Sequence, residues 1–502
     1  MGGSFNFADR AKMLFNSYTY IFLFLPLAYL LYFAIGTSQN GTARHVFLVL
    51  ASLFFYGYWN PSYLPLILGS ILVNYALGSK IISLRICKNE ESLLLRKLLL
   101  WAGLVFNISL IAVFKYADFF IENVNFAFSA DIPLPHILLP LAISFFTFQQ
   151  IAFLVDCYKS EIVVRDSLVT YSLFITFFPQ LIAGPIVRHR QIIDQFTNPA
   201  NLGKNYSNIS KGVFIFAIGL FKKVMIADYL SVFVSAAFDS GTELNFFAAW
   251  TGSLCYTFQL YFDFSAYCDM AIGSALLFNI YLPINFSSPY KALNIQDFWR
   301  RWHISLMHFL RDFVYIPLGG NRRSPARTYA NVIAVFFIAG LWHGAGWLFI
   351  IWGMLHALAS VAYRFWKGLG FVMNKYAAWA LTFMFVNFAW VFFRAKTLDD
   401  AFRVLRGMFG LSGAPAKLPL ERIAYPDIFL REVFAPLNLT MPMLYSMAVL
   451  CAASVVAFFC PNSIEMKDRF SPTPKLAAFT VALLAVSLLN LNKVSEFIYF
   501  NF

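Results

Sequence analysis

The sequence has little charge. Only 13% of its 502 residues are Asp, Glu, Lys or Arg, whereas 60% are hydrophobic and 19% are aromatic. Soluble domains usually carry about 25% charged residues, so this composition excludes an ordinary soluble protein. The sequence also has no tandem repeat, no low-complexity tract and no linker long enough to separate soluble domains. We therefore expect residues 1–502 to form a single integral membrane domain.

Familiar motifs of soluble enzymes are missing as well. There is no GxSxG, P-loop or HExxH motif, and no GxGxxG between a strand and a helix, which excludes the common hydrolase, nucleotide-binding, zinc-protease and dinucleotide-binding folds. The six cysteines form no CxxC pair, so neither a disulfide framework nor a zinc site is indicated. We expect no metal, and we interpret the cysteines as small core residues.

What the sequence has instead is a series of long uncharged runs. Each run can hold at least one helix of roughly 17 to 25 residues that spans or re-enters a membrane. With a charge-interrupted span expected near residues 212–238, we predict about 11 to 13 membrane segments in an all-α bundle. The first run lacks the features of a cleaved signal peptide, so we expect it to be retained. The uncharged runs are residues 14–43, 46–79, 98–114, 132–155, 167–187, 244–262, 270–290, 328–363, 376–393, 433–464 and 476–492.

The formal net charge of +13 is spread over short loops and does not form one basic patch. This distribution is typical of topology signals in a bilayer and does not indicate nucleic-acid binding. By the positive-inside rule, two basic segments should face the cytosol. They contain Lys80, Arg85, Lys88, Arg96 and Lys97, and Arg300, Arg301, Arg311, Arg322, Arg323 and Arg327.

His343 lies in the longest uncharged run, the 36 residues 328–363, within the sequence GLWHGAGW. A titratable ring at membrane depth is costly and therefore marks a candidate functional site. As one helix, this run would measure about 54 Å, well beyond a bilayer core of roughly 30 Å, so we expect it to break at the glycines. Irregular backbone at that depth lines a cavity or is buried in protein. His343 is therefore our first candidate for catalysis.

His303 is the second candidate. Residues 294–297 can start a helix, and residues 298–314 then place His303 on an apolar face together with tryptophans and leucines. We expect one amphipathic helix at the membrane surface, or a re-entrant one, that ends near Pro317. Arg300, Arg311 and His308 should fall on other faces, in a loop or at an interface.

Two carboxylates, Asp263 and Asp269, lie between two uncharged runs. They either cap and join helices or orient a polar cavity. Six residues apart on a helix, they would point to largely different faces, so a catalytic pair that shares a proton is not expected. We favour a supporting role for both.

The chain resembles the membrane-bound O-acyltransferase superfamily, and within it the alginate O-acetyltransferase branch. The order and spacing of the matching segments are specific, and the resemblance covers nearly the whole chain. A start at Met13 is compatible with the pattern, because the 12 residues before it fall outside. The matching segments are residues 13–18 (MLFNSY), 178–188 (FPQLIAGPIVR), 263–273, 297–306 (DFWRRWHISL), 317–322 (PLGGNR) and 340–347.

The resemblance implies that His343 is the essential histidine of the superfamily and that His303 is the second histidine of this branch. It also implies a bundle around a central catalytic tunnel, with the acyl donor entering from the cytosol and the acceptor from the outer side. Residues 497–502 (FIYFNF) look like the aromatic C-terminal motif of polysaccharide and teichoic-acid acylation systems. In that motif Tyr499 would be an acyl carrier; an interfacial aromatic anchor is the alternative.

We therefore expect an enzyme of the bacterial inner membrane that moves acetyl from cytosolic acetyl-CoA to an exported polysaccharide such as alginate or cellulose. His343 would be the general base and His303 would orient the thioester or relay a proton. The expected partners are a periplasmic SGNH-type acetyltransferase and the polysaccharide synthesis and export machinery. Candidates for donor binding are Asn321, Arg322 and Arg323, and candidates for support or acyl relay are Asp263, Asp269, Trp342 and Tyr499.

Two alternatives stay open from the sequence. One keeps the superfamily and changes the acceptor to a teichoic acid, a lipid or a protein. The other is a proton-coupled transporter or flippase in which the histidines relay protons.

Overall fold

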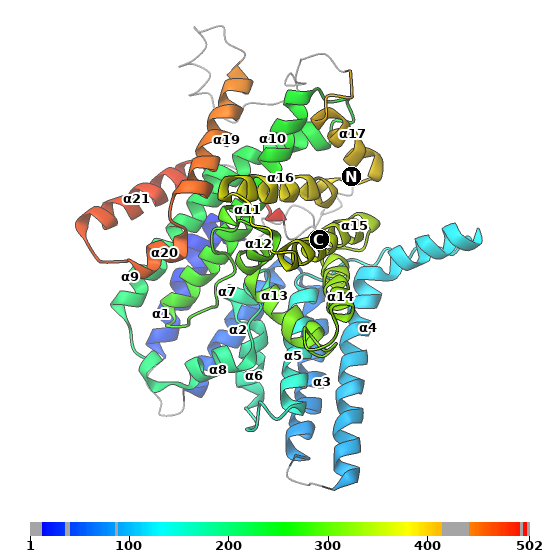
Figure 1. Cartoon of the computed structure of the whole chain (residues 1–502). Helices are drawn as coiled ribbons and strands as arrows, with labels where there is room; N and C mark the ends of the chain where they lie inside the picture. The colour runs from blue at the N-terminus through cyan, green and yellow to red at the C-terminus, as the bar shows by residue number, and fades with distance from the viewer. Residues whose placement is uncertain (1–12, 36–40, 86–88, 414–440, 492–494, 499–502) are drawn as a thin grey trace, which may run out of the picture.

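The protein is described by a computed structural model, which covers residues 13–35, 41–85, 89–413, 441–491 and 495–498 (Figure 1). These residues form helices and connecting segments, and no strand occurs among them. The expected all-α class is therefore confirmed. The helices are α1 Leu25–Ala34, α2 Thr42–Trp59, α3 Leu64–Ser83, α4 Glu90–Phe128, α5 Ile143–Tyr158, α6 Leu168–Thr176, α7 Phe178–Leu181, α8 His189–Thr197, α9 Tyr206–Phe221, α10 Asp228–Phe238, α11 Phe246–Leu277, α12 Ile295–Arg301, α13 Ile304–Leu310, α14 Pro325–His343, α15 Trp347–Gly368, α16 Lys375–Arg394, α17 Leu398–Met408, α19 Met441–Phe459, α20 Ser463–Asp468 and α21 Pro474–Leu489.

Several helices are apolar enough for a bilayer. Four of the described helices have the length and composition of a membrane span, and α4 presents Leu94, Trp101 and Val105 to its surroundings with more than half of each side chain exposed. Apolar side chains on the outside are what a helix needs in lipid. The total of 11 to 13 segments stays a prediction. The four spans are Pro61–Ser83, Glu90–Phe128, Trp347–Gly368 and Lys375–Arg394, and shorter apolar helices are Thr19–Ala34, Ile143–Tyr158, Met447–Phe459 and Pro474–Leu489.

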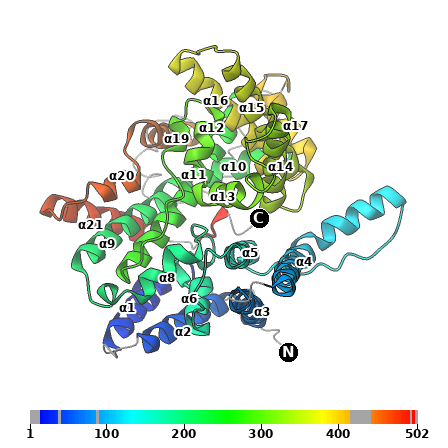
Figure 2. The ribbon, with the colours of Figure 1, turned by 60° about the horizontal axis from the view of Figure 1, so that its bottom comes forward.

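Helix α11 forms the centre of the bundle. Most of its 32 residues are buried, and it packs against α9, α10, α16 and α17. Figure 2 shows α11 and α13 between a group made of α14 to α17 and a group made of α1, α2, α6 and α8. The charge-interrupted span expected near residues 212–238 is a continuous helical run, in which the π-helix Lys222–Ala227 joins α9 to α10. Lys222 and Lys223, the two lysines of that π-helix, form ion pairs with carboxylates of α11.

The expected break at His343 is confirmed. Helix α14 ends at His343, Gly344 and Gly346 have extended backbone, and α15 begins at Trp347. The two helices then run antiparallel in close contact. A Cβ atom added at Gly340 would lie 2.5 Å from the Phe349 carbonyl oxygen, and one at Gly353 would lie 2.4 Å from that of Phe336. Glycine is therefore required for this helix pair to close, and the pair carries His343 at its tip.

The cysteines match their expected role only in part. Cys157, Cys255 and Cys268 are buried, whereas Cys451 is exposed on α19. The interpretation of all six as core residues is therefore wrong for Cys451, because an apolar run in a membrane helix can face lipid as well as protein.

Candidate active site

His343 is buried among aromatic rings at the end of α14, with 3% of its surface exposed. The ring centroids of Trp342, Trp352 and Phe393 lie 4.9, 5.0 and 5.1 Å from that of His343. Such walls exclude water and favour the neutral imidazole, which is the form that can accept a proton. The structure therefore gives His343 the surroundings that a buried general base needs.

His303 lies beside His343, and their ring centroids are 6.3 Å apart. It is fully buried and packs against Trp342, with the ring centroids 5.6 Å apart. Two histidines 40 positions apart in the sequence are thus brought together inside the bundle, with Trp342 packed against both. His303, Trp342 and His343, all candidate site residues, therefore form one cluster.

Asn285 fixes the tautomer of His303. The Asn285 Oδ1 atom accepts hydrogen bonds from the backbone N–H and the hydroxyl of Ser305, at 3.1 and 2.8 Å. Because that oxygen can only accept, His303 Nδ1, at 3.2 Å from it, must be the donor. A neutral His303 then carries its lone pair on Nε2. Sequence reasoning missed Asn285, whose only signal was an amide next to an apolar segment.

The expected single helix over residues 298–314 is wrong. Helix α12 ends at Arg301, Trp302 is extended, and His303 has a positive φ of 44° before α13 begins at Ile304. The backbone N–H of Ile304 donates to the Asn285 carbonyl at 3.0 Å, so tertiary hydrogen bonds hold this break. A left-handed non-glycine residue costs energy and persists only where the surrounding structure holds it, as the bonds to Asn285 do here. The break turns the His303 ring toward His343.

Asp263 and Asp269 neither cap nor join helices, because α11 continues through both positions. Each pairs with a lysine of the π-helix: Lys223 Nζ lies 2.7 Å from Asp263 Oδ1, and Lys222 Nζ lies 2.8 Å from Asp269 Oδ2. Buried charges are tolerated only when they are paired and hydrogen-bonded. Both carboxylates thus tie α11 to the run of α9 and α10.

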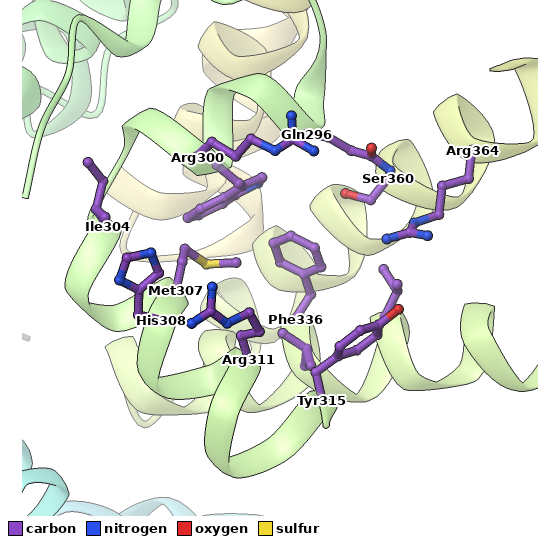
Figure 3. Close-up of a pocket in the computed structure, with 13 residues that line it drawn as sticks. Gln296, Arg300, Ile304, Met307, His308, Arg311, Tyr315, Phe336, Ser360 and Arg364 are labelled. Carbon is purple, nitrogen blue, oxygen red and sulfur yellow. The ribbon is translucent and has the colours of Figure 1, made fainter. Parts of the chain in front are cut away.

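An inner pocket lies against α12, α13, α14 and α15 and has a volume of about 420 Å³. Its walls are mostly apolar, and Arg300, Arg311 and Arg364 project around it together with Ser360 (Figure 3). Among the described residues, neither the buried Ser360 hydroxyl nor Arg364 Nε has a hydrogen-bond partner. A ligand with an apolar body and anionic or acceptor groups fits such a wall. Ile304, the neighbour of His303, also lines the pocket.

The predicted donor-binding residues lie elsewhere. Asn321, Arg322 and Arg323 are exposed in the segment between the π-helix Arg311–Tyr315 and α14, and Arg323 lines a separate depression with Arg327. None of the three lines the inner pocket. Sequence reasoning had assigned Arg300 and Arg311 to a loop or an interface, and it passed over Arg364 at the end of the uncharged run.

An outer pocket of about 850 Å³ begins just beyond the glycine break. Residues 345–349 line it, as does Phe393, whose ring packs against His343. Its charges are paired: Arg394 Nη2 and Lys396 Nζ lie 2.6 and 3.0 Å from the Asp239 carboxylate. Burial raises the pKa of Asp239, but the hydrogen bonds and charges of Arg394 and Lys396 outweigh it and hold the pKa below its usual value.

The end of the described chain reaches this outer pocket, where Glu496 and Ile498 form part of the lining. The Ile498 backbone N–H donates to Asp263 Oδ2 at 2.8 Å, and Lys223 Nζ donates to the Glu496 carbonyl at 2.9 Å. Tyr499, the predicted acyl carrier, lies outside the described residues. Within the described part of the chain, no cluster of three or more His, Cys, Asp or Glu could hold a metal ion.

The chain is similar to known acyltransferases. A family model described as the membrane-bound O-acyltransferase family matches residues 158–398. A peptidoglycan O-acetyltransferase of Helicobacter pylori is 45% identical, with 98% of each chain covered, and a probable alginate O-acetylase of Pseudomonas aeruginosa is 37% identical over 79% of this chain and 75% of its own. A teichoic acid D-alanyltransferase of Bacillus subtilis is 26% identical over 52% of this chain and 70% of its own. The chain belongs to the membrane-bound O-acyltransferase family and is an O-acyltransferase.

Proposed function

We propose that this enzyme transfers acetyl from cytosolic acetyl-CoA, across the bacterial inner membrane, to a hydroxyl group of a cell-wall or exported glycan. The observation that carries this proposal is the position of the two histidines, 6.3 Å apart, between a pocket lined by Ile304, the neighbour of His303, and a pocket lined by Phe393, which packs on His343. In this proposal the donor approaches the pair of rings from the first pocket and the acceptor from the second.

The inner pocket supports a coenzyme A thioester as the donor. Its guanidinium groups suit phosphate oxygens, its apolar wall suits the pantetheine arm, and Ser360 and Arg364 offer donors to amide or carbonyl oxygens. In this proposal Arg300, Arg311 and Arg364 replace Asn321, Arg322 and Arg323 as the groups that bind the donor. The acetyl group would point toward His303 and His343.

His343 would act as the general base. It takes the proton of the acceptor hydroxyl as the oxygen attacks the thioester carbonyl, the C–S bond then breaks, and the proton passes to the departing thiolate of CoA. Such proton transfer contributes about 10² to 10⁴ in rate. His303, held through Nδ1 by Asn285, would use Nε2 to orient the thioester or relay a proton.

Peptidoglycan is the acceptor that we favour. The relative matched over 98% of both chains carries peptidoglycan in its name, and the alginate relatives match less of this chain. A periplasmic acetyltransferase of the SGNH type, or Tyr499, would take the acetyl group from the outer pocket to the polymer. Alginate or another exopolysaccharide is the alternative acceptor.

The test compares His343→Ala with His136→Asn, which alters a histidine whose side chain is 76% exposed. In cells with equal membrane abundance of each variant, we expect His343→Ala to lower acetyl ester content by about 10² or more and His136→Asn to leave it unchanged. Acetylation that persists with His343→Ala would overturn the assignment of the base. Alkaline release of acetate from purified peptidoglycan and from exopolysaccharide identifies the acceptor.

A further inference from the structure

Side chains of α4 form hydrogen bonds with the C-terminal end of α14, which carries His343. Lys115 Nζ donates to the carbonyl oxygens of Trp342 and His343, at 2.6 and 3.2 Å. The hydroxyl of the next residue, Tyr116, donates to the Leu341 carbonyl. The last carbonyls of a helix have no partner within it, so two consecutive side chains of α4 satisfy the end of α14.

Lysine suits this position for an electrostatic reason. The C-terminal end of a helix carries partial negative charge, and an ammonium group offers three donors to it. Among the described residues no carboxylate forms an ion pair with Lys115, so its contacts at this end of α14 are with backbone oxygens. A lysine at membrane depth is costly and is found where it serves a function.

The same helix also contacts the far side of the break. Trp347 Nε1, at the start of α15, donates to Asn123 Oδ1 at 3.0 Å, and the Trp347 ring packs on Phe119 with the centroids 5.8 Å apart. Helix α4 therefore holds both the end of α14 and the beginning of α15. Of the three residues between them, Ala345 and Gly346 line the outer pocket.

We propose that Lys115 is a positioning residue for acyl transfer: by holding the carbonyls of Trp342 and His343, it fixes the height and direction of the His343 ring between the two pockets. This inference rests on the proposed role of His343 as the base. The rings around His343 exclude water, and the backbone at the helix end, which Lys115 holds, sets where the imidazole begins. A displacement of about 1 Å at a reacting group can cost about 100-fold in rate.

The test uses Lys115→Met, which keeps the length of the side chain, and Lys115→Arg, which restores a cationic donor. Lys97→Gln is the matched control, because it removes an exposed lysine from the same helix. Inverted membrane vesicles of the source bacterium retain partner proteins and polymer, and they present the cytosolic face to labelled acetyl-CoA. Label incorporated into polymer, divided by enzyme amount from immunoblots, gives apparent kcat and KM.

We expect Lys115→Met to lower kcat by about 100-fold while KM for acetyl-CoA stays within about twofold, because the donor pocket is untouched. Lys115→Arg should recover most of the rate, Tyr116→Phe should lose about threefold, and Lys97→Gln should match the wild type. A wild-type kcat in Lys115→Met, or a loss that only follows a fall in folded enzyme or a rise in KM, overturns the inference.

The two proposals fail in different ways. If His343→Ala is active in the same vesicles, the proposed function is wrong. If His343→Ala is inactive and Lys115→Met has the wild-type kcat, the role of His343 stands and that of Lys115 does not.

Discussion

The inner and outer pockets differ in how their basic side chains are paired. In the inner pocket, Arg311 Nε lies 2.7 Å from Asp312 Oδ1, whereas Arg300 and Arg364 form no ion pair with a carboxylate among the described residues. In the outer pocket, Arg394 and Lys396 share the carboxylate of Asp239. Unpaired guanidinium groups attract an anionic ligand, whereas basic side chains that share a carboxylate attract it less.

This difference matches the chemistry proposed for the two substrates. Coenzyme A carries several phosphate charges, and a glycan hydroxyl carries none. The direction of transfer across the membrane would thus be set by which substrate each pocket admits, with His303 and His343 between them.

The largest effect is expected from removing two cationic groups of the inner pocket. The double variant Arg300→Gln and Arg364→Gln should raise KM for acetyl-CoA by about 100-fold or more, because each substitution removes a charge-assisted hydrogen bond worth about 1.5 to 3 kcal/mol. kcat should change little. The matched control, Arg322→Gln with Arg323→Gln, should keep the wild-type KM. Initial rates in vesicles give the KM and kcat of each variant. A larger rise in KM for the Arg322 and Arg323 variant than for the Arg300 and Arg364 variant would place the donor site at residues 321–323.

A smaller effect is expected at Ser360, whose buried hydroxyl faces the inner pocket. Ser360→Ala should raise KM for acetyl-CoA about two- to tenfold, the value of one neutral hydrogen bond of about 0.5 to 1.5 kcal/mol. Its stability should equal that of the wild type, since the hydroxyl bonds to no described residue. A lower melting temperature with unchanged KM would mean that the hydroxyl serves the fold and not the ligand.

The smallest effect is expected at Asp239 in the outer pocket. Asp239→Asn leaves Arg394 and Lys396 without their carboxylate and should lower the free energy of unfolding by about 0.2 to 1 kcal/mol, with the KM for acetyl-CoA unchanged. Because the folded state holds the pKa of Asp239 below its usual 3.8, this stabilisation is present above that pH and is lost as the pH falls through the lowered pKa. Thermal unfolding is measured from pH 3 to pH 8. The melting temperature of the wild type should exceed that of the variant by a constant amount above about pH 5, and the difference should shrink at acid pH. A difference in melting temperature that grows on acidification would contradict the pairing of Asp239 with Arg394 and Lys396.

The break at His343 could be predicted from the sequence because it follows from length and composition. A run of 36 uncharged residues is too long for one span, and Gly344 and Gly346 mark where it divides. The all-helical class followed from the same apolar runs. The family, recognised from its motifs, replaced the transporter alternative with an acyltransferase.

The break at His303 could not be predicted in this way. Residues 298–314 have helical spacing throughout, and the chain departs from it because Asn285 bonds to Ser305, Ile304 and His303. The hydrophobic periodicity of a segment depends on that segment alone, so it carries no information on hydrogen bonds to residues elsewhere in the chain. For the same reason, the pairing of Lys222 with Asp269 and of Lys223 with Asp263 could not be predicted. Nor could the hydrogen bond from Lys115 to the carbonyl of His343.

The bonds between residues 495–498 and α11 have a consequence for the order of folding. Lys223 can reach Asp263 as soon as α9, α10 and α11 are made, but the other oxygen of Asp263 accepts from the backbone of Ile498. That donor leaves the ribosome more than 200 residues later. Until then this carboxylate at the centre of the bundle lacks one of its hydrogen bonds, so we expect the bundle to gain stability when residues 495–498 are added.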